Sequence, residues 1–228
     1  MIVSGMVKSS LVDYPSLVSA VLFTPGCNFD CYYCHNRQLI NGSSESLDQV
    51  EIESFLAKRS GLLDAVVVTG GEPALHSDLI PFLESIKRHG YKIKLDSNGS
   101  APQVIEEVLR SGLCDYFAID YKAPIARYAE FCGKNANADA VLATITALID
   151  TNAAFEVRTT VAPQLHEDDL VLMAKELPVL PRYVLNRYRL PEHYLPQDRD
   201  RILETPYSQE QIDAFAILLR KWQPNATS

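Results

Sequence analysis

Three cysteines lie within eight residues of this chain, and their spacing is typical of a metal centre. Cys27, Cys31 and Cys34 form the pattern C-x3-C-x2-C in the segment PGCNFDCYYCHN. Three thiolates on one short loop can converge on a single centre, and thiolate is the ligand that iron–sulfur clusters and zinc prefer. Because three protein ligands leave one position of a four-site centre open for a substrate, the spacing favours an iron–sulfur cluster that takes part in chemistry.

Two other interpretations fit the same cysteines. A structural zinc ion needs a fourth ligand, and His35 is the candidate, although neighbouring residues such as Cys34 and His35 rarely reach one tetrahedral metal. Inert buried thiols are the second alternative. Cys114 and Cys132 stand alone, without a second C-x2-C pair, and we interpret both as structural cysteines.

The composition of the chain limits its function classes. Among 228 residues, 47% are hydrophobic and 22% charged, which is typical of a globular protein and not of a disordered one. The formal charge of -8 predicts no nucleic-acid partner and no anionic membrane partner. An odd number of cysteines, three of them crowded together, does not fit a secreted disulfide framework. With no export signal in the first residues, we expect a reducing compartment, the cytoplasm.

Apolar β-branched runs alternate with stretches of helical periodicity. The predicted strands are Val18–Thr24, Ala65–Thr69, Tyr91–Leu95, Tyr116–Asp120, Phe155–Val161 and Tyr183–Tyr188. Apolar residues at helical spacing predict helices around residues 79–86, 104–109, 141–149 and 212–219. Continuous apolar runs such as residues 66–68 favour parallel strands that are buried on both faces. The order predicts an α/β fold with parallel strands, either an open doubly wound sheet or a full or partial barrel.

We expect a single domain over residues 1–228, with a core at about 16–190. Asn41–Ser46 is predicted to be a polar loop leading into a helix. Pro191–Pro206 is predicted to be an extended cover segment, which together with a last helix makes up residues 191–228. Between Arg182 and Arg201, five arginines and three acids give a net charge of +2, which fits either solvated surface or a docking site for an acidic partner.

Polar residues and glycines follow or end four predicted strands. They are Gly70, Gly71 and Glu72 after the second strand, Asp96 and Ser97 after the third, Lys122 after the fourth, and Arg158 in the fifth. Each alone also fits an ordinary turn or a solvated side chain. An arginine among apolar strand residues is costly unless it is paired, and paired glycines let a backbone approach a ligand closely. Since barrels build active sites at the carboxyl ends of their strands, the four together indicate one site.

These motifs, taken in order, resemble the radical S-adenosylmethionine superfamily. That family carries C-x3-C-x2-C after the first strand of a partial (β/α)6 TIM-like barrel, so the resemblance implies this fold. It implies that Cys27, Cys31 and Cys34 hold a [4Fe–4S] cluster, which is also the catalytic centre, and that the fourth iron chelates S-adenosylmethionine. Tyr33 matches the aromatic residue that usually precedes the last cysteine.

The strand ends match motifs with which the family binds S-adenosylmethionine. The resemblance implies that the GGE segment surrounds the methionine amino group. It also implies that the DSNG segment, similar to LDTNG, lies beside the methionine carboxylate, where a monovalent cation can bind. The implied cofactor-binding residues are Tyr33, Gly70, Gly71, Glu72, Asp96, Ser97, Lys122 and Arg158.

The C-H-N ending at residues 34–36 resembles activating enzymes of glycyl radical enzymes, most of all those of anaerobic ribonucleoside-triphosphate reductase. The resemblance implies an oxidoreductase that reductively cleaves S-adenosylmethionine to a 5′-deoxyadenosyl radical and generates a glycyl radical on a partner enzyme. It implies a flavodoxin- or ferredoxin-type electron donor. The alternatives are a radical enzyme acting on a small molecule or peptide, such as 7-carboxy-7-deazaguanine synthase, which usually shows C-D-T, and a non-enzymatic iron–sulfur protein.

Overall fold

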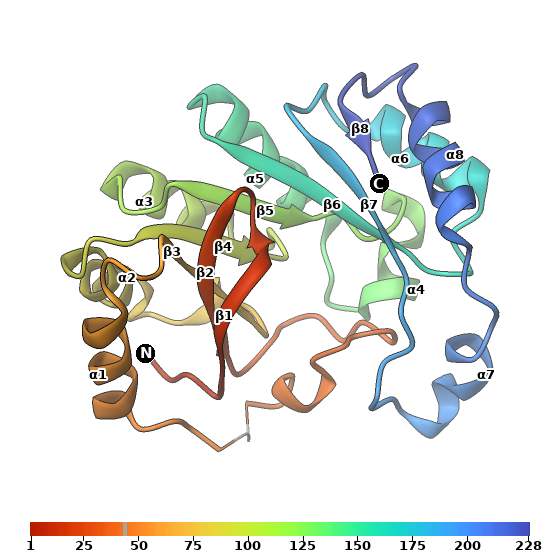
Figure 1. Ribbon diagram of the computed structural model, residues 1–228. Coiled ribbons are helices and arrows are strands. Elements are labelled where there is room, and N and C mark those ends of the chain that lie inside the picture. The colour runs from red at the N-terminus through yellow and green to blue at the C-terminus, as the bar shows by residue number, and fades with distance from the viewer. Residues whose placement is uncertain (43–44) are drawn as a thin grey trace.

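The protein folds around one curved sheet with helices on its outer side (Figure 1). The computed structural model describes residues 1–42 and 45–228. Six parallel strands follow one another in chain order: β2 Leu17–Thr24, β3 Ala65–Gly70, β4 Lys92–Ser97, β5 Tyr116–Asp120, β6 Phe155–Val161 and β7 Tyr183–Arg187. A doubly wound sheet reverses its strand order, and this sheet does not. The partial barrel is therefore the correct alternative.

Two edge strands were not expected from the sequence. β1, Gly5–Tyr14, pairs antiparallel with β2, and β8, Ala226–Thr227, pairs parallel with the start of β7. β1 has few buried residues, and β8 is too short to give a pattern, so neither produces an apolar signal. Within the described part of the chain, no pairing joins β8 to β1, and the barrel stays open on that side.

Eight α-helices connect or flank the strands in the described residues. They are α1 Gln49–Arg59, α2 Leu79–Arg88, α3 Pro102–Ser111, α4 Tyr128–Cys132, α5 Ala138–Asp150, α6 Glu167–Glu176, α7 Arg199–Ile202 and α8 Gln209–Leu219. The four helices predicted from periodicity correspond to α2, α3, α5 and α8. None of the described helices is long and apolar enough to cross a membrane.

Strand alternation divides the apolar residues between two cores. Val66 and Val68 belong to the main core with the helices, whereas Ala65 and Val67 belong to a small cluster with Tyr14. This small cluster fills the inside of the barrel toward its amino end. The carboxyl ends of the strands are left to polar side chains, and the site lies there.

The two predicted loop segments have different outcomes. Residues 43 and 44 of the Asn41–Ser46 segment lie outside the described residues, and α1 begins soon after it. The segment Pro191–Pro206 is not fully extended, because it contains a 3-10 turn, Pro196–Asp198, and α7. It does cover the cysteine loop, since the Arg201 guanidinium lies 3.8 Å from the centre of the Tyr32 ring.

Candidate active site

The cysteine loop leaves β2 at the carboxyl end of the barrel and is held by backbone hydrogen bonds. Gly26 N donates to Leu39 O at 2.7 Å, which closes the loop on itself. Glu72 N donates to Gly26 O at 2.7 Å, and Asp30 N donates to Cys132 O at 2.8 Å. The loop is therefore fixed both to the segment after β3 and to the end of α4.

The two glycines after β3 allow this close contact. A Cβ atom on Gly71 would lie 2.0 Å from Gly26 O, and one on Gly70 would lie 2.3 Å from Thr24 N. Gly70 also has a φ of 121°, which side chains rarely allow. The sequence predicted that the two glycines let the backbone approach a ligand closely. In the structure, part of this close approach is to the backbone of the cysteine loop.

The three cysteines lie in surroundings that disfavour free thiolates. Burial raises the pKa of Cys27 to about 12 and also raises the pKa of Cys34. The pKa of Cys31 is raised by a hydrogen bond with the Cys132 thiol and by burial. Bound iron would supply the nearby positive charge that stabilises a thiolate, as metal ions do at the thiols that coordinate them. The donor set therefore fits a cluster.

An aromatic wall surrounds the loop. The Tyr33 ring lies 5.0 Å from the Tyr32 ring and 6.3 Å from the Phe131 ring, centre to centre. The Tyr33 hydroxyl is buried and has no hydrogen-bond partner among the described residues. Such a wall shields one side of the loop from water, and the unpaired Tyr33 hydroxyl remains free to hydrogen-bond to a bound group.

The zinc interpretation finds no ligand set. Nowhere in residues 1–42 and 45–228 do three His, Cys, Asp or Glu side chains lie close enough for one metal ion. A four-iron cluster spaces its cysteines more widely than a single ion does, so the same geometry does not argue against a cluster. His35, the proposed fourth ligand, instead points Nε2 at Arg189 O, 2.8 Å away.

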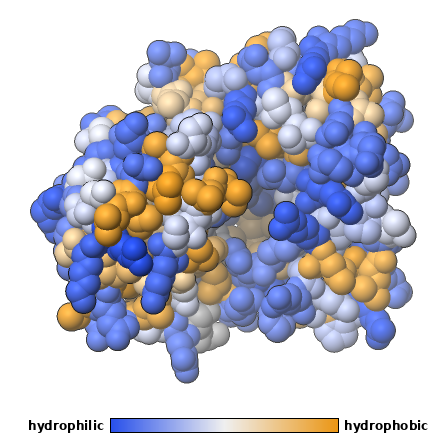
Figure 2. Space-filling model, viewed as in Figure 1, coloured by the Kyte–Doolittle hydropathy of each residue, from blue (hydrophilic) through white to orange (hydrophobic). Residues whose placement is uncertain are grey.

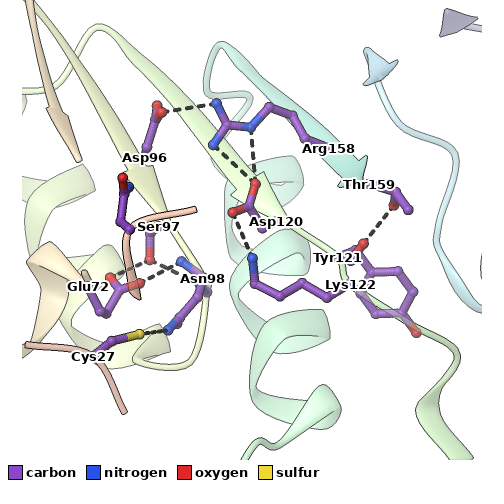
Figure 3. A network of polar contacts seen from close by, with 12 residues as sticks. Cys27, Glu72, Asp96, Ser97, Asn98, Asp120, Tyr121, Lys122, Arg158 and Thr159 are labelled. Carbon is purple, nitrogen blue, oxygen red and sulfur yellow. Dashed lines mark hydrogen bonds and ion pairs between the residues drawn. The ribbon is translucent and has the colours of Figure 1, made fainter. Parts of the chain in front are cut away.

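A chain of charged side chains crosses the ends of β4, β5 and β6 (Figure 3). Arg158 joins two carboxylates, with Nη1 3.0 Å from Asp96 Oδ2 and Nη2 3.1 Å from Asp120 Oδ1. Lys122 Nζ lies 2.9 Å from Asp120 Oδ2, and Lys94 pairs with Asp96 Oδ1. The partner expected for the strand arginine is therefore present. With all groups charged, three cations and two anions leave a net charge of +1.

Electrostatics keeps Asp120 ionised. Burial alone would raise the pKa of Asp120, but Lys122 and Arg158 outweigh it and lower that pKa to about 2. Asp120 is thus a carboxylate at neutral pH. We name these five residues, Lys94, Asp96, Asp120, Lys122 and Arg158, the charged network.

Glu72 points to the turn after β4 and is completely buried. Its Oε1 accepts hydrogen bonds from Ser97 Oγ at 2.8 Å and Ala74 N at 3.0 Å, and its Oε2 accepts one from Asn98 N at 2.6 Å. Burial raises its pKa to about 7. The structure thus places Glu72 as a brace for the DSNG turn.

A cavity of about 200 Å³ lies between the cysteine loop and the strand ends. It is lined by Cys34, His35, Asn36, Thr69, Gly70, Gly71, Asp96, Ser97, Asn98, Asp120 and Arg158. Larger grooves exist, such as one of about 610 Å³ between α1 and α2, but it contains none of the motif residues.

The cavity brings together most of the residues predicted from the sequence. Cys27, Cys31, Tyr33, Glu72 and Lys122 are predicted residues that do not line it. Residues that do line it but were not selected are His35, Asn36, Thr69, Asn98 and Asp120. Several of these residues lie inside the motifs themselves. Their position next to a predicted site residue was the feature of the sequence that could have identified them.

Comparisons with known proteins agree with these motifs. Residues 21–177, more than half of the chain, match the family model described as the Radical SAM superfamily. The chain is 35% identical over 202 residues to the "Putative glycyl-radical enzyme activating enzyme" of Methanocaldococcus jannaschii, across 85% of this chain and 82% of that protein.

Two further matches are more distant. The chain is 26% identical over 126 residues to a 7-carboxy-7-deazaguanine synthase of Thermococcus kodakarensis, across 46% of this chain and 49% of that protein. Streptococcus suis SuiB, solved with S-adenosylmethionine bound, superposes with a TM-score of 0.59 and 14% identity, across 89% of this chain and 48% of that chain. At that identity, the likeness supports the fold alone.

Proposed function

The chain belongs to the radical SAM superfamily, and from this premise we propose that it is the activating enzyme of a glycyl radical enzyme. Membership makes the chain an enzyme whose cofactors are a [4Fe–4S] cluster and S-adenosylmethionine. The observation that carries the finer proposal is the match to the M. jannaschii protein named for glycyl radical activation, which extends over most of both chains. The C-H-N ending supports it.

The residues of this chain have separate tasks in the proposed reaction. Cys27, Cys31 and Cys34 hold the cluster, and the aromatic wall shields one side of it from water. When bound, the cluster supplies the electron that cleaves S-adenosylmethionine to the 5′-deoxyadenosyl radical. In the proposal, Tyr33 places its free hydroxyl toward the bound cofactors.

The cavity side chains orient S-adenosylmethionine in this proposal. The backbone at Gly70 and Gly71 receives the methionine amino group, and the net positive charge of the network receives the carboxylate, with Asp96, Ser97 and Arg158 at the cavity wall. Lys122 acts through Asp120. Glu72 acts through the DSNG turn that it braces. A monovalent cation is not part of the proposal, because Lys94 and Arg158 already occupy both Asp96 oxygens.

The partner would enter through the open side of the barrel. Figure 2 shows the surface hollowed at the centre of this face, between β1 and β7 and beside the cysteine loop. Hydrophilic residues surround much of the hollow (Figure 2). A peptide loop that carries the target glycine fits such an opening. We propose anaerobic ribonucleotide reductase as the partner and the cytoplasm as the location.

The electron donor is proposed to be an acidic flavodoxin- or ferredoxin-type protein. Only part of the predicted basic stretch is available to it. Arg182 pairs with Glu156 at the amino end of β7, and Arg201 pairs with Asp198 within the cover segment. Arg187 donates to Tyr207 O, whereas Arg189 and Arg199 are exposed and remain as the steering charges.

Electron paramagnetic resonance with candidate partners tests the proposal. The reduced, reconstituted protein with S-adenosylmethionine should produce a glycyl radical signal on anaerobic ribonucleotide reductase. The Cys31→Ala variant should produce none. A signal with another glycyl radical enzyme alone would change the partner, and no signal with any of them would reject the activating function.

The match to 7-carboxy-7-deazaguanine synthase favours one second candidate, a radical enzyme that acts on a small molecule. Cleavage of S-adenosylmethionine would then be stimulated by a small substrate and not by a protein. Comparing the rates with either addition separates the two functions.

A further inference from the structure

A side-chain amide lies against the sulfur of one cluster cysteine. Asn98 Nδ2 is 3.7 Å from Cys27 Sγ, and Figure 3 shows the amide reaching the sulfur from the turn after β4. We propose that Asn98 is a positioning residue whose N–H donates to the Cys27 sulfur and thereby sets the reduction potential of the cluster. The proposal rests on the cluster of the superfamily and not on the identity of any partner enzyme.

The neighbours of Asn98 fix which end of the amide faces the sulfur. Its Oδ1 accepts a hydrogen bond from Ser100 N at 2.9 Å. A backbone N–H can only donate, so the oxygen must face Ser100 and the nitrogen must face Cys27. Nδ2 also donates to Asn28 Oδ1 at 3.0 Å, and Asn28 Nδ2 donates to Ser100 Oγ at 2.8 Å. A flipped amide would lose these contacts.

The backbone of Asn98 is held as firmly as its side chain. Asn98 N donates to the buried Glu72 carboxylate, and Ser97 Oγ accepts a hydrogen bond from Gly99 N at 3.0 Å while donating to the same carboxylate. Asn98 itself is only 5% exposed. The donor is therefore preorganised, and little side-chain freedom remains to be lost when the sulfur carries more charge.

The direction of the effect follows from charge. A reduced cluster carries one more electron than an oxidised one, and hydrogen bonds to cluster sulfurs are among the factors that set its potential. An N–H donor stabilises the more negative state, so it raises the potential. Without Asn98, the cluster should be harder to reduce.

Redox titration of the reconstituted protein, followed by electron paramagnetic resonance without S-adenosylmethionine, measures this directly. Asn98→Ala should keep its iron and lower the ratio of reduced to oxidised cluster about fivefold at a fixed potential, the factor that corresponds to one ordinary hydrogen bond. A tenfold change would equal about 59 mV for this one-electron step. Ser97→Ala is the matched control, because it removes hydrogen bonds from the same turn but none to sulfur.

The results separate a donor from a mere turn residue. An unchanged potential in Asn98→Ala at full iron content, or an equal shift in Ser97→Ala, would overturn the proposal. If Asn98→Ala fails to hold iron, Asn98→Ser replaces it, since serine can still cap the turn but is too short to reach the sulfur. That variant should also have a lower potential, and a wild-type value would overturn the proposal. No partner protein is needed, so these outcomes leave the glycyl radical proposal to its own test.

Discussion

The cysteine loop and the charged network line the same cavity. They differ in whether their ionisable side chains have partners of opposite charge within the chain. Cys31 is buried, and Cys27 and Cys34 are partly buried; this partial burial raises the pKa of Cys27 and Cys34, and no nearby cation offsets it. In the network, each carboxylate oxygen of Asp96 and Asp120 already has a cationic partner. The proposed cluster would therefore complete one half of the site, whereas the ion pairs of the other half are complete within the chain.

Removal of a single thiol should affect the loop most strongly. We expect the wild-type protein to take up about four irons per chain on anaerobic reconstitution. Cys31→Ala should lose most of this iron, because two remaining thiolates cannot hold the cluster. Iron and zinc analysis of the purified variant checks this. Retention of one tightly bound zinc would contradict the cluster assignment.

Removal of the central cation should affect the network without affecting the loop. Arg158→Ala leaves the buried Asp96 and the half-buried Asp120 with one partner each. Breaking a fully buried ion pair costs about 3–5 kcal/mol, and because Arg158 and Asp120 are partly exposed we expect the low end, about 3 kcal/mol. The free energy of unfolding in urea should fall by this amount in the metal-free protein, whereas iron uptake should stay near wild type. Affinity for S-adenosylmethionine should also fall.

Cys31→Ala is the matched comparison for that stability measurement. Its metal-free form should lose less stability than Arg158→Ala does, since the alanine removes one weak thiol hydrogen bond, to Cys132, and no ion pair. An equal loss of stability in both variants would contradict the division between the two halves.

The pH dependence of stability should reveal Glu72. Burial raises its folded-state pKa to about 7 from an ordinary value of 4.5. Between these values the unfolded chain ionises Glu72 while the folded chain keeps it protonated, so stability should fall as the pH rises from about 4.5 to about 7 and then level off. The size is about 3 kcal/mol. Comparing Glu72→Gln with wild type across this range isolates the effect.

The glutamine variant has its own constant cost at every pH, because its amide has one acceptor oxygen where the carboxylate has two, so a backbone donor, Ala74 N or Asn98 N, loses its acceptor. The readout is therefore how the difference in unfolding free energy between wild type and Glu72→Gln changes with pH, and not the absolute size of that difference. A difference that stays flat from pH 4.5 to pH 7 would mean that Glu72 titrates normally.

The smallest effect is expected at the exposed arginines. Charge reversal at Arg189 and Arg199 should slow activation of a partner a few-fold at low ionic strength, and the difference should close as salt rises. Cleavage of S-adenosylmethionine with dithionite should be unchanged, because no protein donor takes part. Arg201 is unsuitable for this test, since it stacks on Tyr32 beside a cluster cysteine. A defect that persists at high salt would indicate a structural role.

The sequence predicted the parts of the site that depend on neighbouring residues. The cysteine spacing and the strand-end motifs are local. The order of strands and helices predicted an α/β fold with parallel strands, and the partial barrel was expected only from the family resemblance. The direction of Glu72 was not predictable, because a buried carboxylate can face a cavity or a turn with the same sequence around it. Lys94 and Asp120 were missed for a related reason, since their roles come from partners on the same and neighbouring strands.

The edges of the fold were also beyond the sequence. β1 is a mostly exposed strand whose side chains give no apolar alternation, and it is fixed by pairing with β2. β8 consists of two residues positioned by α8 and β7. In both places tertiary pairing, and not local preference, decides the structure.

The central claim is that this chain removes a hydrogen atom from a glycine of a partner enzyme. The most direct measurement uses a partner labelled with deuterium at the glycine Cα, incubated anaerobically with the reduced protein and S-adenosylmethionine. We predict that deuterium appears in the 5′-deoxyadenosine product and that the glycyl radical signal of the partner forms together with it. Formation of unlabelled 5′-deoxyadenosine alone, with no radical on the partner, would contradict the claim.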